Sequence, residues 1–187
     1  MREILLSTQP KWCEKIGSGE KKDEVRKTRP KGQEPFKCFI YCTKADKKEQ
    51  ALLVDKNGRL SFGDYRNADN NDYYIANGKV IGEFICDFID EFGMAGKGIT
   101  MKRFSALYET RLSVDEMKKY ANGKTTLYGW HISNLVIYDK PKKLSDFNKL
   151  CPTKKEYDCE NCERSEQYVC ANYLTRPPQS WQYVLEK

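Results

Sequence analysis

Three charged residues near the N-terminus have types and a spacing that can bind a nucleotide. They are Lys21, Glu24 and Arg26, in the order K-x-x-E-x-R. Alternate side chains of a strand share a face, so Glu24 and Arg26 are expected on one face, with Lys21 at the turn before them. The Glu24 carboxylate can accept from the exocyclic amine of cytosine, or hold Arg26 as a fork for phosphate. Gly19 allows the backbone to approach such a ligand closely.

The same residues allow a second chemistry, because a partly desolvated lysine such as Lys21 can act as a general base. A lysine beside a glutamate is usually kept protonated, which favours binding over catalysis. A competing interpretation is a surface ion pair between Glu24 and Arg26, with Lys21 in solvent.

Three tryptophans are candidates for stacking on an extruded base, namely Trp12, Trp130 and Trp181. A tryptophan in a small barrel is more often part of the core, and Trp12 is the strongest candidate of the three. Before Trp181, two prolines favour an extended loop that presents Arg176 and Gln179 in set directions. Glutamine can read a base edge through two hydrogen bonds. The alternative is that these prolines only pack the last crossover against the barrel.

Four cysteines fall within 20 residues: Cys151, Cys159, Cys162 and Cys170. Four thiolates can close a tetrahedral zinc shell, and the gap of two residues between Cys159 and Cys162 is typical of zinc knuckles. We therefore predict a structural zinc ion that clamps an acidic loop. An iron–sulfur cluster and a reduced loop without metal are the alternatives. The one histidine, His131, excludes a site with two imidazoles and is expected to be hydrogen-bonded within a strand.

The composition describes a globular chain. Of its 187 residues, 39% are hydrophobic and 12% aromatic, which argues against disorder and favours a single domain over residues 1–187. No stretch reaches the roughly 20 apolar residues of a membrane helix, and the first residues are too briefly apolar for a secretory signal. A cytoplasmic location is predicted, where cysteines are free thiols or metal ligands.

The charge is distributed unevenly along the chain. The net charge is +6, and residues 1–60 contain 15 Lys and Arg against 9 Asp and Glu. The densest basic run, residues 26–31, includes Arg29. Such a region suits a polyanion, because each phosphate contact releases counterions, and nucleic acid, with RNA favoured, is the expected partner. A solvated loop that only aids solubility would have the same pattern.

Short strands with few helices must position these residues. The hydrophobic pattern predicts strands at 1–7, 24–26, 38–43, 60–62, 79–89, 127–138 and 181–185, and helices at 11–16 and 113–120, with a short turn or helix beginning at 145–147. Ser113 and Glu116 form a capping-box pattern, after which Val114, Met117 and Tyr120 are expected on one helical face. The predicted fold class is α+β, a small mixed β-barrel with short helices packed on it and a cysteine-rich insert at 151–170.

The N-terminal motif resembles the signature of the ASCH domain, P-x-W followed by I-x-x-G-x-K-x-x-E-x-R. Its positions are Pro10, Trp12, Ile16 and Gly19, and then the K-x-x-E-x-R motif. The resemblance continues weakly through residues 80–84 and 129–133. It implies a PUA-like barrel whose G-x-K-x-x-E-x-R segment faces a ligand cleft. Relatives of this superfamily bind RNA or modified bases.

Some ASCH proteins are also thought to cut RNA, and some resemble hydrolases that deacylate a modified cytidine with a Lys, a Thr and a Glu. The Lys of that set falls on Lys21. Its Thr falls on Glu24, so this chain departs from the set and lacks the hydroxyl there.

The leading hypothesis is a module that binds RNA or a single modified base or nucleotide. Its expected ligand-binding residues are Trp12, Gly19, Lys21, Glu24, Arg26, Arg29, Arg176 and Gln179. The alternative is a hydrolase, either an N4-acylcytidine amidohydrolase or a ribonuclease, with Lys21 and Glu24 as catalytic residues. A third possibility is a protein-interaction factor whose basic loop binds an acidic partner.

Overall fold

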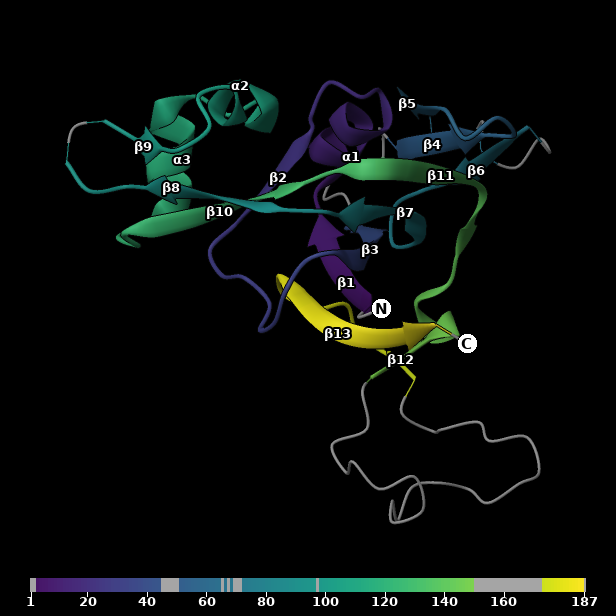
Figure 1. Ribbon diagram of the computed structural model, residues 1–187. Coiled ribbons are helices and arrows are strands. Elements are labelled where there is room, and N and C mark those ends of the chain that lie inside the picture. The colour runs from purple at the N-terminus through teal and green to yellow at the C-terminus, as the bar shows by residue number, and fades with distance from the viewer. Residues whose placement is uncertain are drawn as a thin grey trace, which may run out of the picture.

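The computed structural model describes residues 3–44, 51–64, 66, 68, 72–96, 98–149 and 173–186. Within these ranges the strands form three sheets, and three short α-helices pack against them (Figure 1). The predicted α+β class, with short helices on a mixed β structure, is confirmed. The described strands stay in three open sheets and do not close into one barrel. None of the described helices is long and apolar enough to cross a membrane.

The largest sheet has six strands in the order β11-β7-β3-β1-β13-β12. These strands are β1 (Glu3–Thr8), β3 (Phe36–Cys42), β7 (Val80–Cys86), β11 (Ser133–Lys142), β12 (Phe147–Lys149) and β13 (Trp181–Glu186). β1 pairs in parallel with β3, whereas the other pairs are antiparallel. The strand predicted at 181–185 is therefore present as β13, and it lies beside the N-terminal strand β1 (Figure 1).

The second sheet has four strands in the order β2-β10-β8-β9. They are β2 (Asp23–Arg26), β10 (Thr126–His131), β8 (Ile89–Gly93) and β9 (Thr100–Met101). Two helices, α2 (Ala106–Thr110) and α3 (Val114–Ala121), lie at this end of the molecule (Figure 1). Val25 of β2 packs with Phe92, Met117 and Leu127 in a buried apolar cluster. This cluster attaches the helices to the sheet, since burial of apolar area is the main stabilising term.

The third sheet is small and lies at the opposite end of the molecule (Figure 1). Its strands are β5 (Leu60–Gly63), β4 (Ala51–Asp55) and β6 (Tyr73–Ile75). Helix α1 (Pro10–Gly17) packs against β5 and β3 and buries Cys13 and Ile16. β4 was not predicted, because it is a short apolar run within a polar stretch. Four of its five residues are nonetheless buried.

Two predicted long strands are each divided between two sheets. The run at 79–89 ends as β7 at Cys86 and resumes as β8 at Ile89, and the run at 127–138 divides between β10 and β11. Ile132, at the second break, donates its N–H to the carbonyl of Lys22. The apolar pattern continues through both breaks because apolar residues stand on either side, although those of β11 and of the start of β8 are only partly buried.

Gly82 of β7 sits where two strands approach closely. A Cβ at this position would lie 2.3 Å from the carbonyl oxygen of Val136 in β11. A side chain at this position would therefore clash with β11, and the pairing of β7 with β3 changes register at the neighbouring step.

Candidate functional site

Strand β2 divides its side chains between two environments. Glu24 and Arg26 face a cavity, while Val25 packs into the apolar cluster beneath α3. Lys21 precedes the strand, and its N–H donates to the carbonyl of Lys15 at the end of α1. Gly19 has a φ of +76°, a left-handed conformation that lets the chain turn from α1 into β2. The predicted shared face of Glu24 and Arg26 is confirmed.

The three motif side chains are all buried. The exposed fractions are 2% for Lys21, 6% for Glu24 and 5% for Arg26. Arg26 Nη2 lies 2.8 Å from Glu24 Oε1, and the same nitrogen donates to the carbonyl of Ser7 and the hydroxyl of Thr8. The interpretation of the motif as a surface ion pair is therefore wrong. The pair is desolvated, and its geometry is held by the end of β1.

The Lys21 ammonium has two kinds of partner. Its Nζ donates to the carbonyl of Thr110, at 2.6 Å, and lies 3.6 Å from Glu24 Oε2. The indole of Trp12 lies on another side, with its centroid 5.1 Å from Nζ. Burial lowers the pKa of Lys21, and the nearby Glu24 carboxylate partly offsets this effect.

One oxygen of Glu24 is left unsatisfied. Oε2 is buried and has no hydrogen-bond partner among the residues that the structure describes. The 3.6 Å ion pair with Lys21 is longer than a hydrogen bond. A buried acceptor without a partner costs about 1–3 kcal/mol. Glu24 lines the cavity while Oε2 itself is covered from solvent, so a donor on a ligand would reach this oxygen once the carboxylate turns towards the cavity.

The cavity is open and has a volume of about 1080 Å³. Two aromatic rings line it, from Trp12 on α1 and Tyr120 on α3. Its cationic lining residues outnumber the acidic ones: Lys11, Lys21, Arg26, Lys27, Lys119 and Lys124 stand against Glu24 and Glu116. The outer lysines Lys11, Lys119 and Lys124 are exposed. The site therefore combines a buried charged floor, aromatic walls and a basic rim.

The structure brings together five of the eight predicted ligand-binding residues. Those that line the cavity are Trp12, Lys21, Glu24, Arg26 and Gln179. The other three are Gly19, Arg29 and Arg176, none of which is part of the described lining.

These three residues have other settings. Arg29 is paired with Glu34 and Glu91. Gly19 shapes the turn into β2, and Arg176 lies on an exposed bend. Gly19 thus shapes the cavity by turning the chain from α1 into β2, and it does not line the cavity itself.

The remaining aromatic candidates belong to the core or its margin. Trp130 is fully buried and packs against Phe36, so it offers no stacking face to a ligand. Trp181 packs at an angle to Trp130 and donates its indole N–H to the hydroxyl of Thr28. Both tryptophans therefore contribute to packing within the protein rather than to a stacking surface for a base.

Sequence reasoning missed the contribution of α3. Tyr120 was expected on the apolar face, but that face is formed by Met117 and Ala121, and Tyr120 lines the cavity with Glu116 and Lys119. The spacing i, i+3 and i+4 of Glu116, Lys119 and Tyr120 places them on one helix face, and this was the available signal. The capping box of Ser113 and Glu116 is confirmed, and it fixes where the helix begins.

A second charged cluster lies near β2, outside the cavity. His131 Nδ1 lies 3.0 Å from Asp23 Oδ1, and Glu109 is close to both, which is a donor set that can bind a divalent cation. The guanidinium of Arg103 already pairs with both carboxylates. This cation occupies the position that a metal would need, so the cluster does not fit a metal ion. The predicted hydrogen bond of His131 is confirmed, although its partner is a side chain.

The predicted zinc ligands, Cys151, Cys159, Cys162 and Cys170, lie outside the described residues. The cysteines within the described ranges, Cys13, Cys38, Cys42 and Cys86, are buried free thiols. Burial raises the pKa of Cys38 and Cys86, which keeps both protonated.

Comparison with known proteins identifies the fold. No protein-family model matches the sequence, and no curated protein matches it. Among solved structures, the chain is similar to the crystal structure of ASCH from Zymomonas mobilis, with a TM-score of 0.51 and 16% identity, over 97% of this chain and 87% of that one.

Two crystal structures of single-substitution variants of the same Zymomonas mobilis protein are also similar. One has a TM-score of 0.52 and 16% identity, over 98% of this chain and 90% of that one. The other has a TM-score of 0.52 and 15% identity, over 97% and 87%. The fold is therefore that of ASCH proteins, as the N-terminal motif indicated.

Proposed function

We propose that the protein binds single-stranded RNA, or a modified base or nucleotide derived from it, with one base in the cavity beside Glu24. The observation that carries this proposal is the buried Glu24 Oε2, which lacks a hydrogen-bond partner among the described residues and belongs to the cavity lining. The exocyclic amine of a base can donate to this oxygen. The adjacent Lys21 ammonium can donate to a ring nitrogen or carbonyl of the same base.

The aromatic lining suits the faces of a base. Trp12 and Tyr120 come from different helices and line the same cavity. Stacking on such rings contributes about 1–3 kcal/mol per base in single-strand binding. A base that leaves its stack would then bind through its faces to the rings and through its edge to Glu24.

The rim lysines suit the backbone of the ligand. Lys119 and Lys124 are exposed, and neither forms an ion pair with a carboxylate in the described part of the chain. Each phosphate contact with such a residue would release counterions, so affinity should depend steeply on salt. This basic rim favours a nucleotide or RNA over an uncharged nucleoside.

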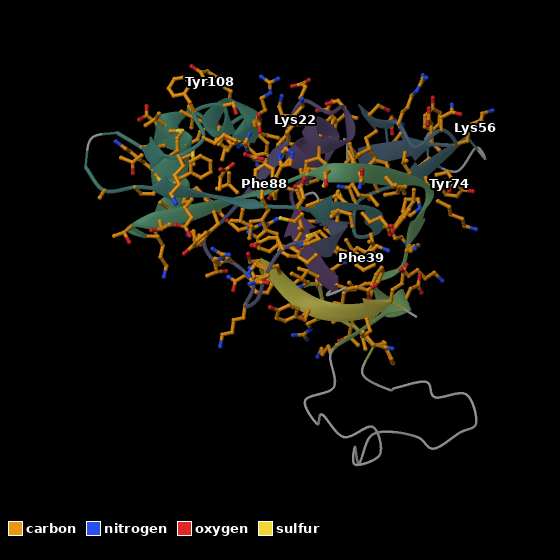
Figure 2. All side chains as sticks on the ribbon, in the orientation of Figure 1. Lys22, Phe39, Lys56, Tyr74, Phe88 and Tyr108 are labelled. Atoms are coloured by element: carbon orange, nitrogen blue, oxygen red, sulfur yellow. The ribbon has the colours of Figure 1, made fainter. Side chains whose placement is uncertain are left out.

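The proposal can be tested by fluorescence anisotropy with a labelled single-stranded RNA at several salt concentrations. We expect the wild-type protein to bind, with affinity falling as salt rises, and Glu24→Gln to bind more weakly by about tenfold or more. Lys56→Ala is a suitable control, because Lys56 is exposed at the opposite end of the molecule (Figure 2). Absence of binding at low salt, or equal binding by Glu24→Gln, would contradict the proposal.

A second candidate function is hydrolysis, which the lowered pKa of Lys21 favours because a neutral lysine can act as a base. The substrate would be an N4-acylcytidine, or RNA itself. Incubation of both substrates with wild-type protein, Lys21→Ala and Glu24→Ala would test this function. The pH dependence separates the two candidates: hydrolysis should rise with pH as Lys21 loses its proton, whereas binding by its ammonium should fall.

We infer a cytoplasmic location from the buried free thiols among the described cysteines. A structural zinc ion held by Cys151, Cys159, Cys162 and Cys170 remains part of the proposal on the strength of their spacing alone.

A further inference from the structure

Arg103 links three segments of the chain around the start of β2. Its guanidinium lies 2.8 Å from Asp23 Oδ2 on β2 and 2.5 Å from Asp90 Oδ2 on β8, and it also pairs with Glu109 of α2. Asp23 is fully buried. A buried carboxylate needs such a partner, because desolvation without a counter-charge is strongly unfavourable.

The other contacts of this cluster hold Arg103 in place. Asp23 Oδ1 faces His131 Nδ1, and the ring of Phe88 stacks on His131 with centroids 4.4 Å apart. The guanidinium carbon of Arg103 lies 5.0 Å from the centroid of Phe88. Phe88 lies between the α2 end of the molecule and the central sheet (Figure 2). Arg103 is thus fixed by charge and by ring contacts.

Helix α2 connects the Arg103 cluster to the segment that positions Lys21 at the cavity. It has five residues, which is too short for a helix to be stable on its own. Its end is bound to the segment before β2: the carbonyl of Glu109 accepts from the N–H of Lys22, and the carbonyl of Thr110 accepts from Lys21 Nζ. The position of α2 therefore sets the position of the Lys21 ammonium.

The consequence for Glu24 follows from the distances. Nζ is 2.6 Å from the Thr110 oxygen and 3.6 Å from Glu24 Oε2. An ammonium beside a buried carboxylate normally closes to about 2.7–2.9 Å. The Thr110 carbonyl competes for the ammonium, and Oε2 is left without a hydrogen bond within the described part of the chain.

We propose that Arg103 is a positioning residue of the cavity, which acts through α2 to hold the Thr110 carbonyl on Lys21 and so leaves Glu24 Oε2 free to accept from a ligand. This inference rests on the proposed function for its ligand, but its first measurement needs none. When the link is broken, Lys21 moves onto Glu24, the free acceptor is lost, and the closer carboxylate stabilises the ammonium.

The direct test is the pKa of Lys21, measured by NMR titration of its labelled side chain in wild-type protein and in Glu109→Gln. This variant removes the charge-assisted contact between Arg103 and the side chain at position 109 and leaves the Asp23–Arg103 pair intact, so the protein is expected to fold. The pKa of Lys21 should rise towards the ordinary lysine value. Loss of the Glu109 charge by itself would lower the pKa of Lys21, so a rise reports a change in the position of the ammonium.

Arg103→Gln and Arg103→Lys extend the test. Arg103→Gln removes a cation, which by itself raises the pKa of Lys21, so the readout for this residue is RNA binding. Arg103→Gln should weaken binding about tenfold, and Arg103→Lys should restore part of it, since it keeps the charge and loses the fork. Val184→Ala is the control for general destabilisation, because Val184 is buried in β13, in a different apolar cluster. It should leave the pKa of Lys21 unchanged.

An unchanged pKa of Lys21 in Glu109→Gln would overturn the inference, and so would an equal rise in Val184→Ala. If wild-type protein fails to bind RNA while the pKa of Lys21 still rises in Glu109→Gln, the proposed function fails and the positioning role stands. The two failures are thus distinguishable.

Discussion

Two neighbouring residues of β2, Asp23 and Glu24, have opposite kinds of environment. Both are buried carboxylates. The oxygens of Asp23 are both paired, one with Arg103 and one with His131. Glu24 has one oxygen on Arg26 and one without a hydrogen bond to any described residue. Asp23 is fully paired within the fold, whereas Glu24 lines the cavity and keeps one oxygen without a hydrogen bond to a described residue.

This difference separates residues that hold the strand from residues that face a ligand. A fully paired buried charge mainly fixes geometry, since removing either partner leaves the other uncompensated. An unsatisfied buried acceptor lowers stability, and one on a residue that lines a cavity is a candidate for completion by a ligand. Substitutions at Asp23 should therefore act on stability, and substitutions at Glu24 on binding.

The largest expected effect is the loss of stability in Asp23→Ala. Removal of this carboxylate leaves His131 without its acceptor, while Arg103 keeps Asp90 and Glu109 as partners, so the free energy of unfolding should fall by about 1–3 kcal/mol. Urea denaturation measures this change. Asp64→Ala, which removes an exposed ion pair with Arg66, is the matched control. It should leave the urea concentration at half unfolding unchanged. An equally small loss of unfolding free energy in Asp23→Ala and Asp64→Ala would contradict the structural role of Asp23.

The next effect concerns pH. Burial lowers the pKa of Lys21, so its ammonium loses the proton earlier on the alkaline side than an exposed lysine does. Binding of an oligocytidine should be constant at neutral pH and weaken as pH rises through this lowered value. Lys21→Arg should keep its affinity in the same range, because arginine stays charged. If the affinities of the wild-type protein and Lys21→Arg changed with pH in the same way, the charge of Lys21 would not contribute to binding.

A smaller effect is expected at the rim. Lys119→Ala and Lys124→Ala should each weaken RNA binding and lower the slope of log affinity against log salt by about one, if each contacts one phosphate. The control is again Lys56→Ala. Loss of affinity without a change in slope would mean that these lysines do not contact phosphate.

The last prediction concerns the metal. Elemental analysis of the purified protein should find about one zinc per chain, and the joint replacement of Cys159 and Cys162 by serine should abolish it. RNA binding should change little, because the acidic composition of 151–170 is unsuited to phosphates. A metal-free protein would favour the reduced loop.

The sequence predicted the local parts of the site and not its long-range pairings. The order of helix, glycine turn and strand over residues 11–26 was predictable, since each element has a short-range signal in Gly19, in the alternation of β2 or in the apolar positions of α1. The Ser113 cap was predictable for the same reason. The burial of Lys21 was not, because it depends on Thr110, which lies 89 positions away.

Several short elements escaped prediction, and α2 and β4 did so for different reasons. Helix α2 is five residues long and has no strong apolar period, and its position depends on Arg103 and Asp23, far apart in the chain. Strand β4 is apolar but is surrounded by polar residues that weaken any local pattern. Tyr120 was assigned to the wrong face, because hydrophobicity alone does not separate a core aromatic from one that lines a cavity.

The most direct test of the central claim is an NMR titration of protein labelled at the glutamate side-chain carboxyl carbons with a short single-stranded RNA. The Glu24 signal, assigned by its loss in Glu24→Gln, should shift in proportion to bound RNA, while that of Glu83, on β7 and paired with Lys37 and Tyr138, should not. RNA binding that leaves the Glu24 signal in place would contradict the account, because the free acceptor would then have no ligand.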